Sequence, residues 1–525
     1  MWYLNTFVLL VVLGPSFQTS TPADDHYVAA VVEYRVNRSS VETNRDNYVV
    51  LIQQAAQQNA DVIVFPEMTL GVGSTNVTVP IRGLLQEYPI PALRPDLYDD
   101  LLVALSQASR QNQIYVVINI RENMNCIQPL EGEECPERKQ YYFNTNVVFD
   151  RNGAVIDRYR KINLFGEASH TPALKPDLGI FTTDFGVTFG HFICFDLMFQ
   201  IPSTQLVQKY NVTDIIFPTM WFSEMPYLTA VTIQESYAYT MDVNFLAAGA
   251  NTVGVGSAGS GIYSGKAGAL AAIMPGSPTT KLLVSRVPKI PGKVTETPSG
   301  RITDSPANLD NLRLKQDPSI TAHLTRPLVE GLQEFTIVDK EVSCRFRVNL
   351  SNRSNTKYQY RAAAFSGVRT HSGFASTGSR ICAILACNGD TKDTCAIRFE
   401  TYTENSTAIF EELTIVGSMP TSVIMPEFGA DDFVVFPVSE TVSIMPLEVP
   451  DFTYYKNVTG NVTVHTLSLD NVSAELHMFG LWGRLFTTDG EDPHPSVDDP
   501  SSSIVHILSR SLLMCILAMF AFNQY

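Results

Sequence analysis

The stretch GHFICFDLMFQ, Gly190–Gln200, places one cysteine in the middle of an apolar run. The residues GVTFGHFI that lead to it are typical of a short buried strand, and those that follow Asp196 are compatible with a helix. Cys194 could therefore be a buried small hydrophobic residue, half of a disulfide, or a nucleophile at a turn between two elements. The rest of the chain has to decide between these three.

Strands and helices alternate on both sides of this stretch, from about residue 26 to residue 300. Apolar residues recur at helical spacing over 44–60, 97–113 and 204–210, and short, fully apolar runs lie between them. Such runs are typical of a sheet that helices cover on at least one face. Strands are predicted over 27–36, 61–67, 114–122, 185–195 and 213–222, and a hairpin over 143–161 with Asn152-Gly153 at its turn.

The pattern changes after about residue 300. A polar segment with scattered prolines, 298–319, indicates a linker or a long surface connection, and strand-like runs dominate beyond it. A chain of 525 residues exceeds what one hydrophobic core usually organises. We therefore expect an α/β domain over 24–310 and a smaller, mostly β domain over 311–490.

Both ends of the chain have the composition of targeting signals. WYLNTFVLLVVL, residues 2–13, is a short apolar core followed by small residues, which predicts a secretory signal peptide over 1–23. Residues 491–525 contain serines 501–503, a spacer and an apolar tail, in the order of a glycosylphosphatidylinositol attachment signal. We expect attachment at Ser501 and an extracellular protein, tethered to the plasma membrane by lipid or secreted. An amphipathic C-terminal helix or a weak membrane span is the alternative.

Sequons for N-glycosylation recur along the chain, as expected of a secreted protein. The sequons lie at Asn37, Asn76, Asn211, Asn349, Asn352, Asn405, Asn457, Asn461 and Asn471.

The net charge of −16 argues against nucleic acid or an anionic membrane surface as the main partner.

Of the eight cysteines, one is expected to remain a free thiol in the mature protein. Cys515 lies in the tail that would be removed, and Cys126 and Cys135 bracket an acidic loop and are predicted to pair. Cys194 then remains unpaired, as a free thiol that could be reactive or inert. The other four are expected to form two disulfides in an order that the sequence leaves open: Cys344, Cys382, Cys387 and Cys395.

Polar residues follow three of the predicted strands and could meet at one edge of the sheet. Glu67 ends FPE, Lys161 lies in RYRKINLFGE, and Cys194 lies in ICFD. Taken singly, each has an ordinary explanation: a solvated loop carboxylate, a surface lysine and an inert buried thiol.

Together, FPE, RKINLFGE and ICFD, in this order and at these separations, resemble the Glu–Lys–Cys signature of the nitrilase superfamily. The similarity continues through IIFPTMWF (215–222), ESYAYTMDVNFLAAGAN (235–251) and GSGIY (259–263). With its terminal signals, sequons and β-rich second domain, the chain is most similar to the vanin and biotinidase branch, over roughly residues 26–490. The resemblance implies an α-β-β-α sandwich followed by a mostly β domain, and an amidase without a cofactor or a metal.

The residue types suit amide hydrolysis through a thioester. A free thiol is only a few per cent thiolate at neutral pH, so Cys194 as nucleophile needs a general base, for which Glu67 is the candidate. Lys161 would favour the thiolate and stabilise the oxyanion of the tetrahedral intermediate. The backbone N–H of Phe195 is the expected second oxyanion donor.

Two further residues are candidates by position. Many members of the superfamily carry a glutamate shortly after the lysine, and Glu167 lies six residues after Lys161. Trp221 could line the substrate pocket or pack in the core. His170 and His191 lack the context of a papain-like cysteine–histidine pair, and the sequence contains no metal-ligand or dinucleotide-loop motif.

The resemblance implies a small-molecule amide substrate, foremost pantetheine, which would give pantothenate and cysteamine. Biotinidase-like hydrolysis of biotin amides is the alternative, and the anchor tail favours the first. A cell-surface binding or adhesion glycoprotein without activity is a hypothesis from another class. The joint presence of Glu67, Lys161 and Cys194 argues against it.

Overall fold

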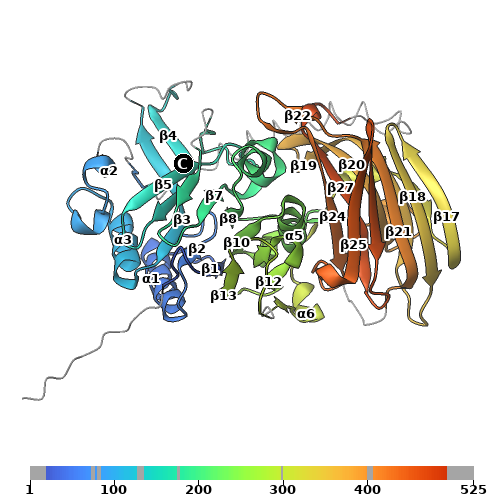
Figure 1. Ribbon diagram of the computed structural model, residues 1–525, viewed down its shortest axis with the longest axis horizontal. Coiled ribbons are helices and arrows are strands. Elements are labelled where there is room, and N and C mark those ends of the chain that lie inside the picture. Colours follow the sequence, from blue (N-terminus) through green and yellow to red (C-terminus); the bar gives the residue numbers. More distant parts are fainter. Residues whose placement is uncertain are drawn as a thin grey trace, which may run out of the picture. The chain divides into compact units, whose positions relative to one another are not determined.

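The computed structural model describes residues 19–71, 77–79, 84–126, 135–173, 178–296, 300–398 and 406–493. The chain forms two compact units (Figure 1). Unit 1 comprises residues 1–223 and 230–314, and unit 2 comprises residues 224–229 and 315–525. The segment 224–229 belongs to unit 2, where strand β9 (Glu224–Met225) pairs in parallel with β15 (Lys315–Gln316).

Unit 1 is built on a continuous ladder of strands with two halves, in the orders β13-β1-β2-β3-β4-β5 and β6-β7-β8-β10-β11-β12-β14. The halves are joined because the end of β1 pairs in parallel with β10, Tyr34 opposite Ala250. The strands of the first half are β1 (His26–Arg35), β2 (Val62–Val64), β3 (Tyr115–Asn125), β4 (Gln140–Phe149), β5 (Val155–Arg160) and β13 (Lys281–Pro288). Those of the second are β6 (Ile180–Thr182), β7 (Thr188–His191), β8 (Asp214–Thr219), β10 (Asn244–Asn251), β11 (Ser260–Ser264), β12 (Ala269–Ile273) and β14 (Gly300–Ile302).

The two halves pack face to face because their strands carry apolar residues on both faces. In β1, Ala29 and Val31 share a core with Ile216 of β8 and Leu246 of β10. Ala30, which lies between Ala29 and Val31 in β1, faces the other side of the sheet and belongs to a separate core, together with residues of two helices. These helices are α1 (Val41–Gln57) and α3 (Asp100–Asn112), seen in blue in Figure 1.

A further helix, α5 (Ala230–Met241), covers the second half. Its Tyr237 packs against Phe245 of β10, with ring centroids 5.0 Å apart, and Phe245 is the neighbour of the core residue Leu246. The layers of unit 1 are thus helix, sheet, sheet and helix, which confirms the predicted α-β-β-α sandwich. The shorter helices are α2 (Leu84–Glu87), α4 (Gln205–Gln208) and α6 (Pro306–Leu309), and short 3₁₀ turns complete the unit.

The segment predicted as a linker is ordered where the structure describes it. Residues Gly300–Ile302 form β14, which pairs with β12 at the end of the ladder. This strand has only three residues, and its Arg301 forms an ion pair with the buried Glu235, so the segment lacks the apolar pattern of a buried strand. Residues 298–319 were predicted as a linker or a long surface connection, and both are wrong for Gly300–Ile302, which form a strand.

Unit 2 is a sandwich of two antiparallel sheets, which confirms the predicted mostly β domain (Figure 1). Its core joins residues of both sheets, for example Phe346 and Ile415 of one with Ile384 and Leu481 of the other. One sheet has the order β16 (Leu324–Pro327), β19 (Gln359–His371), β20 (Ala375–Cys387), β27 (Leu476–Leu485) and β24 (Phe433–Thr441). The other has the order β17 (Gly331–Asp339), β18 (Val342–Ser351), β21 (Ile409–Pro420), β26 (Val462–Leu469) and β25 (Phe452–Thr459). A short ribbon pairs β22 (Ile424–Met425) with β23 (Ala430–Asp431).

The disulfides answer the pairing question that the sequence left open. Cys126 pairs with Cys135, as predicted. In unit 2, Cys344 of β18 pairs with Cys382 of β20 and so links the two sheets, while Cys387 pairs with Cys395. Cys194 is free and buried.

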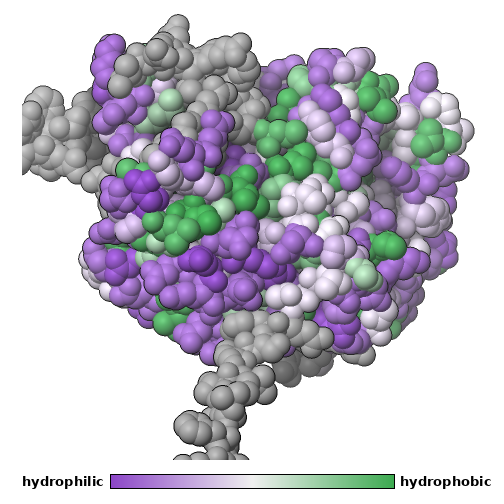
Figure 2. All heavy atoms as spheres, turned by 60° about the vertical axis from the view of Figure 1, so that its left-hand side comes forward, coloured by the Kyte–Doolittle hydropathy of each residue, from purple (hydrophilic) through white to green (hydrophobic). Residues whose placement is uncertain are grey.

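The surface is mainly polar on the face drawn in Figure 2, where hydrophobic side chains form separate patches. Among the described residues, no helix has both the length and the apolar character needed to cross a membrane.

Candidate active site

Three strand ends of unit 1 carry the predicted catalytic side chains. Glu67 follows β2, Lys161 directly follows β5, and Cys194 follows β7. All three line one cavity of about 380 Å³, together with Glu167. All three residues are almost fully buried: 3% of Glu67, 1% of Lys161 and 5% of Cys194 is exposed.

The rest of the cavity wall consists mainly of apolar side chains, with two arginines among them. Its apolar side chains come from loops and strands on several sides, and Arg38 and Arg121 also line it. A mostly apolar cleft with a few polar groups is typical of small-molecule sites. The apolar residues are Met68, Ile120, Phe165, Met220 and Phe222.

Lys161 lies between two carboxylates. Its Nζ donates to Glu67 Oε1 at 2.8 Å and to Glu167 Oε1 at 2.7 Å. Burial alone would lower the pKa of Lys161, but Glu67 and the other acidic groups around it raise that pKa well above its ordinary value. Lys161 is therefore a cation at neutral pH, as a stabiliser of negative charge must be.

Glu167 lines the same cavity and is hydrogen-bonded to Lys161. Burial would raise its pKa, but the charge of Lys161 and the backbone N–H of Phe165 lower it, and the net effect is a lowered pKa. Glu167 is therefore a carboxylate at neutral pH that neutralises part of the lysine charge. The structure thus brings Glu167 next to Lys161, at the place expected from its spacing in the sequence.

Two asparagines that sequence reasoning missed fix the position of Glu67. Glu67 Oε1 accepts from Asn144 Nδ2 at 2.7 Å, and Glu67 Oε2 accepts from the backbone N–H of Met220 at 2.8 Å. Asn144 also donates to Glu167 at 3.2 Å, and its Oδ1 accepts from Asn119 Nδ2 at 2.7 Å. Both are buried polar residues within strands, Asn119 in β3 and Asn144 in β4, but each strand contains several other polar residues, so the sequence does not single them out.

Cys194 begins a 3₁₀ turn, η2 (Cys194–Met198), with a φ of +47°. A residue other than glycine rarely adopts this left-handed conformation, and such residues cluster at functional sites. The helix expected after this turn is short: η3 (Gln200–Thr204) leads into α4, so the predicted helix over 204–210 spans only Gln205–Gln208.

Asp196 holds this turn in place. Its Oδ2 accepts from the backbone N–H of Ile193 at 3.1 Å and from the hydroxyl of Tyr159 at 2.8 Å. Its Oδ1 accepts from the backbone N–H of Asn163 at 2.9 Å. Burial raises the pKa of Asp196 to about 6. Asp196 therefore ties the turn of Cys194 to the strand β5 and the loop that carries Lys161.

The environment of Cys194 sets its resting protonation state. Burial raises the pKa of the thiol well above its ordinary range, the charge of Glu67 raises it further, and the charge of Lys161 opposes both. Cys194 is therefore a neutral thiol at rest. A base must take its proton when it attacks a substrate.

The two remaining candidates are placed differently. Phe195 follows the nucleophile in the turn, and its ring packs edge-on against Phe165 with centroids 4.9 Å apart. Trp221 is not among the side chains that line the cavity, whereas its neighbours Met220 and Phe222 are. The indole of Trp221 lies in the packing around Phe217, 6.3 Å away between centroids, as in the core alternative.

The two histidines considered in the sequence do not line this cavity. His191 Nε2 lies 2.9 Å from Asp157 Oδ2, and the ring of His191 is fully buried. Burial lowers the pKa of His170 to about 4, so this ring is neutral. A papain-like cysteine–histidine pair is therefore not formed.

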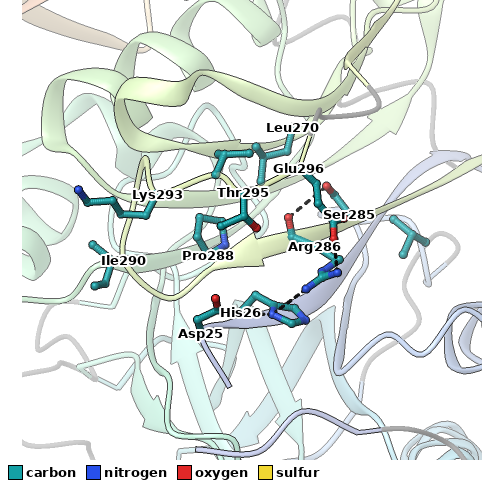
Figure 3. Close-up of a pocket in the computed structure, with 12 residues that line it drawn as sticks. Asp25, His26, Leu270, Ser285, Arg286, Pro288, Ile290, Lys293, Thr295 and Glu296 are labelled. Carbon is teal, nitrogen blue, oxygen red and sulfur yellow. Dashed lines mark hydrogen bonds and ion pairs between the residues drawn. The ribbon is translucent and has the colours of Figure 1, made fainter. Parts of the chain in front are cut away.

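A second cavity of unit 1, of about 350 Å³, lies beside β1 and β13 (Figure 3). In its wall, Arg286 donates to His26 Nδ1 at 3.0 Å and forms an ion pair with Glu296. No thiol lines it. This cavity lacks the groups for the predicted chemistry, which points to the cavity of Cys194 as the site.

Known proteins match both units. The family described as carbon-nitrogen hydrolase matches residues 28–266, and the vanin C-terminal domain matches residues 312–489. Vanin-like protein 1 of Drosophila melanogaster is 33% identical over 86% of this chain and 84% of that protein. Human biotinidase is 29% identical over 91% of this chain and 93% of its own length. The human pantetheine hydrolase VNN2 is 28% identical, over 81% and 85%.

Proposed function

Because the chain belongs to the vanin and biotinidase branch of the carbon-nitrogen hydrolases, we propose that it hydrolyses a small-molecule amide through a thioester on Cys194. The observation that carries the proposal is the cavity of about 380 Å³ that Glu67, Lys161, Glu167 and Cys194 line together. It holds a nucleophile, a base and a cation within one small site, which is the set that the chemistry requires.

In the first half of the reaction, Glu67 accepts the thiol proton as Cys194 Sγ attacks the amide carbonyl carbon. The carbonyl π electrons move to oxygen, and Lys161 Nζ and the backbone N–H of Phe195 stabilise the resulting oxyanion. The carbon–nitrogen bond then breaks, and the amine leaves with the proton that Glu67 returns. The acyl group remains on Cys194 as a thioester.

In the second half, water replaces the amine. Glu67 accepts a proton from that water, the hydroxide oxygen attacks the thioester, and the same two donors stabilise the oxyanion. The carbon–sulfur bond breaks, the acid leaves, and the thiolate recovers its proton. Glu167 and Asn144 act as positioning residues, since each is hydrogen-bonded to the group that the reaction uses.

Pantetheine is the substrate that we propose, with biotin amides as the second candidate. Relatives that carry each activity in their names are similar to this chain over most of its length. The anchor-like tail favours the vanin type. The purified ectodomain should be assayed on pantetheine and biocytin side by side, with Cys194→Ala as the control. Turnover of biocytin alone would reverse the substrate order, and turnover of neither would remove both candidates.

We propose further that the protein is secreted and glycosylated. Its disulfides support an oxidising compartment. Asn349 lies within β18 and donates to Glu411 at 2.8 Å, so we expect it to stay unmodified. Asn211, Asn352, Asn457 and Asn461 are exposed and should carry glycan.

Glycopeptide mass spectrometry of the protein from secreting cells measures the occupancy of each sequon. Glycan on Asn349 together with bare Asn457 and Asn461 would contradict the assignment. Asn37 and Asn471 are partly exposed, and Asn76 and Asn405 lie outside the described residues.

The lipid anchor is a separate proposal, because Ser501 and nearly all of the expected signal peptide and tail lie outside the described residues. The order of small residues, spacer and apolar tail supports it. Treatment of intact cells with phosphatidylinositol-specific phospholipase C should release the protein. A protein that stays on the cell while a known anchored protein is released would contradict the anchor.

A further inference from the structure

The cavity of Cys194 contains more positive charge than its chemistry uses. Arg38, from the loop after β1, and Arg121, in β3, line it together with Lys161. The two carboxylates of the cavity, Glu67 and Glu167, are both paired with Lys161. Among the residues that the structure describes, neither arginine has an ion-pair partner. The cavity therefore offers two cations without counter-charge, in a chain whose net charge is −16.

Arg121 is held in place, but its donors are largely unused. Its guanidinium lies over the ring of Tyr142, 4.4 Å from the ring centroid. Its Nη2 donates only a long hydrogen bond of 3.4 Å, to the carbonyl of Ser169. Its Nε is shielded from solvent and has no hydrogen-bond partner within the described residues. Leaving a buried donor unsatisfied is costly, and a fixed guanidinium suits bidentate binding of a carboxylate or phosphate.

Other arginines of unit 1 show that this state is not general. Arg138 lies over the same Tyr142 ring, at 4.6 Å, but it donates to the carbonyl of Gln140 at 2.8 Å and to Thr171 Oγ1 at 2.9 Å. Arg286, which lines the second cavity, is paired with Glu296 (Figure 3). Of these three arginines, only Arg121 lacks both an ion pair and a hydrogen bond of ordinary length.

We propose that Arg121, assisted by Arg38, selects amide substrates that carry an anionic group, a carboxylate or a phosphate, on one arm. The inference rests on the proposed hydrolysis at Cys194 and adds the charge of the preferred substrate. The apolar side chains of the cavity contact the part of the substrate between the amide and the anion. Arg121 binds the anion and satisfies its own buried Nε, which makes it a specificity-determining residue.

Three amides of one series test this and separate the two sources of the anion. They are pantetheine, pantetheine with a phosphate ester on its terminal hydroxyl, and the amide of pantothenate with cysteine. The second carries the anion on the acyl arm and the third on the amine arm. We expect kcat/KM for one of the two anionic amides to exceed that for pantetheine by roughly 10-fold or more, as charge-assisted hydrogen bonds allow.

The variant Arg121→Gln removes the charge and keeps a polar side chain of similar reach. The preference for the anionic amide, expressed as the ratio of the two kcat/KM values, should fall by roughly 10–100-fold, mainly through KM. Arg121→Lys should keep most of the preference. Arg138→Gln is the matched control, because it removes a cation from the same aromatic ring and should leave the ratio unchanged. A ratio that Arg121→Gln does not alter would overturn the proposal, even if pantetheine is turned over.

Binding to Cys194→Ala decides the case in which no amide is turned over. Calorimetry should show tighter binding of one anionic amide than of pantetheine, and the variant Cys194→Ala/Arg121→Gln should lose the difference. That result without turnover would support the charge preference and contradict the proposed substrates. Equal binding of all three amides, or no binding of any, would overturn the inference.

Discussion

At the scale of single residues, Lys161 forms ion pairs with both Glu67 and Glu167 and is the proposed donor to the oxyanion. Its charge is shared between Glu67 and Glu167, which keeps both carboxylates close to the thiol. Asn144 donates to both carboxylates as well, at 2.7 and 3.2 Å. The cation is therefore the centre of the hydrogen-bond network, and its loss should affect chemistry and electrostatics together.

Lys161→Met tests this role. The removal of one oxyanion donor typically lowers kcat about 10²–10³-fold, so a loss of at least this size is expected. The pKa of Glu167 should rise, because the charge that lowers it is gone. Steady-state kinetics over a pH series measures both effects. Lys281→Met, on the exposed side of β13, is the control, and a Lys161→Met enzyme with wild-type kcat would contradict the assignment.

Sequence alone predicted that Glu67, Lys161 and Cys194 would meet, because each follows a strand and their order matches a family signature. Their catalytic roles stay predictions. Asn144, Asn119 and Asp196 could not be assigned in the same way. Their function depends on which side chains of neighbouring strands face them, and a single sequence does not contain that register.

At the scale of elements, the two sheet halves of unit 1 meet at a buried acid. Glu33 of β1 accepts from Asn251 Nδ2 of β10 at 2.8 Å and from Ser260 Oγ of β11 at 2.6 Å. Burial raises the pKa of Glu33 to about 7. The proton that it holds in the folded state therefore links the stability of this junction to pH.

Glu33→Gln tests that link. A carboxyl whose folded pKa lies above its unfolded value contributes stability that is present below about pH 4.5 and is lost as pH rises through about 7. The wild type should lose roughly 3 kcal/mol relative to Glu33→Gln between these limits, at about 1.4 kcal/mol per pKa unit. Thermal melting from pH 4 to 8 measures it, with the exposed Glu87→Gln as control. Parallel curves for wild type and Glu33→Gln would contradict this account.

Elements were predicted where apolar periodicity is strong and missed where it is not. The strand β1 and the helices α1 and α3 coincide with periodic or fully apolar segments. In the segment after Cys194, apolar residues occupy positions 195, 197–199 and 201, and this pattern does not distinguish a helix from the tight turns that the structure shows. The strand β14 is too short to show a pattern, and its Arg301 is paired with the buried Glu235, so the segment was predicted as a linker or a long surface connection.

At the scale of the whole molecule, unit 1 contains the candidate active site, and unit 2 is a sandwich with a disulfide between its sheets. The disulfide Cys344–Cys382 joins the two sheets of unit 2 and closes a loop of 38 residues. Cysteine counting predicted two disulfides here, but pairing depends on which strands lie opposite each other. The mostly β class of unit 2 was thus predictable from the sequence, and the disulfide between its two sheets was not.

Replacing this pair by Cys344→Ala/Cys382→Ala should destabilise unit 2 by about 2–4 kcal/mol, because the unfolded chain gains the freedom of an open loop. Calorimetry of the variant should show the unfolding transition of unit 2 at a lower temperature. Cys387→Ala/Cys395→Ala opens a loop of only 8 residues and should cost less. The opposite order of the two variants would contradict the entropic explanation.

The proposed thioester on Cys194 is tested most directly by rapid quenching of the wild-type enzyme with pantetheine, followed by peptide mass spectrometry. We expect a pantothenoyl group on the peptide that contains Cys194, and no adduct and no turnover with Cys194→Ala. An acyl group on another residue, or turnover by Cys194→Ala close to that of the wild type, would contradict it.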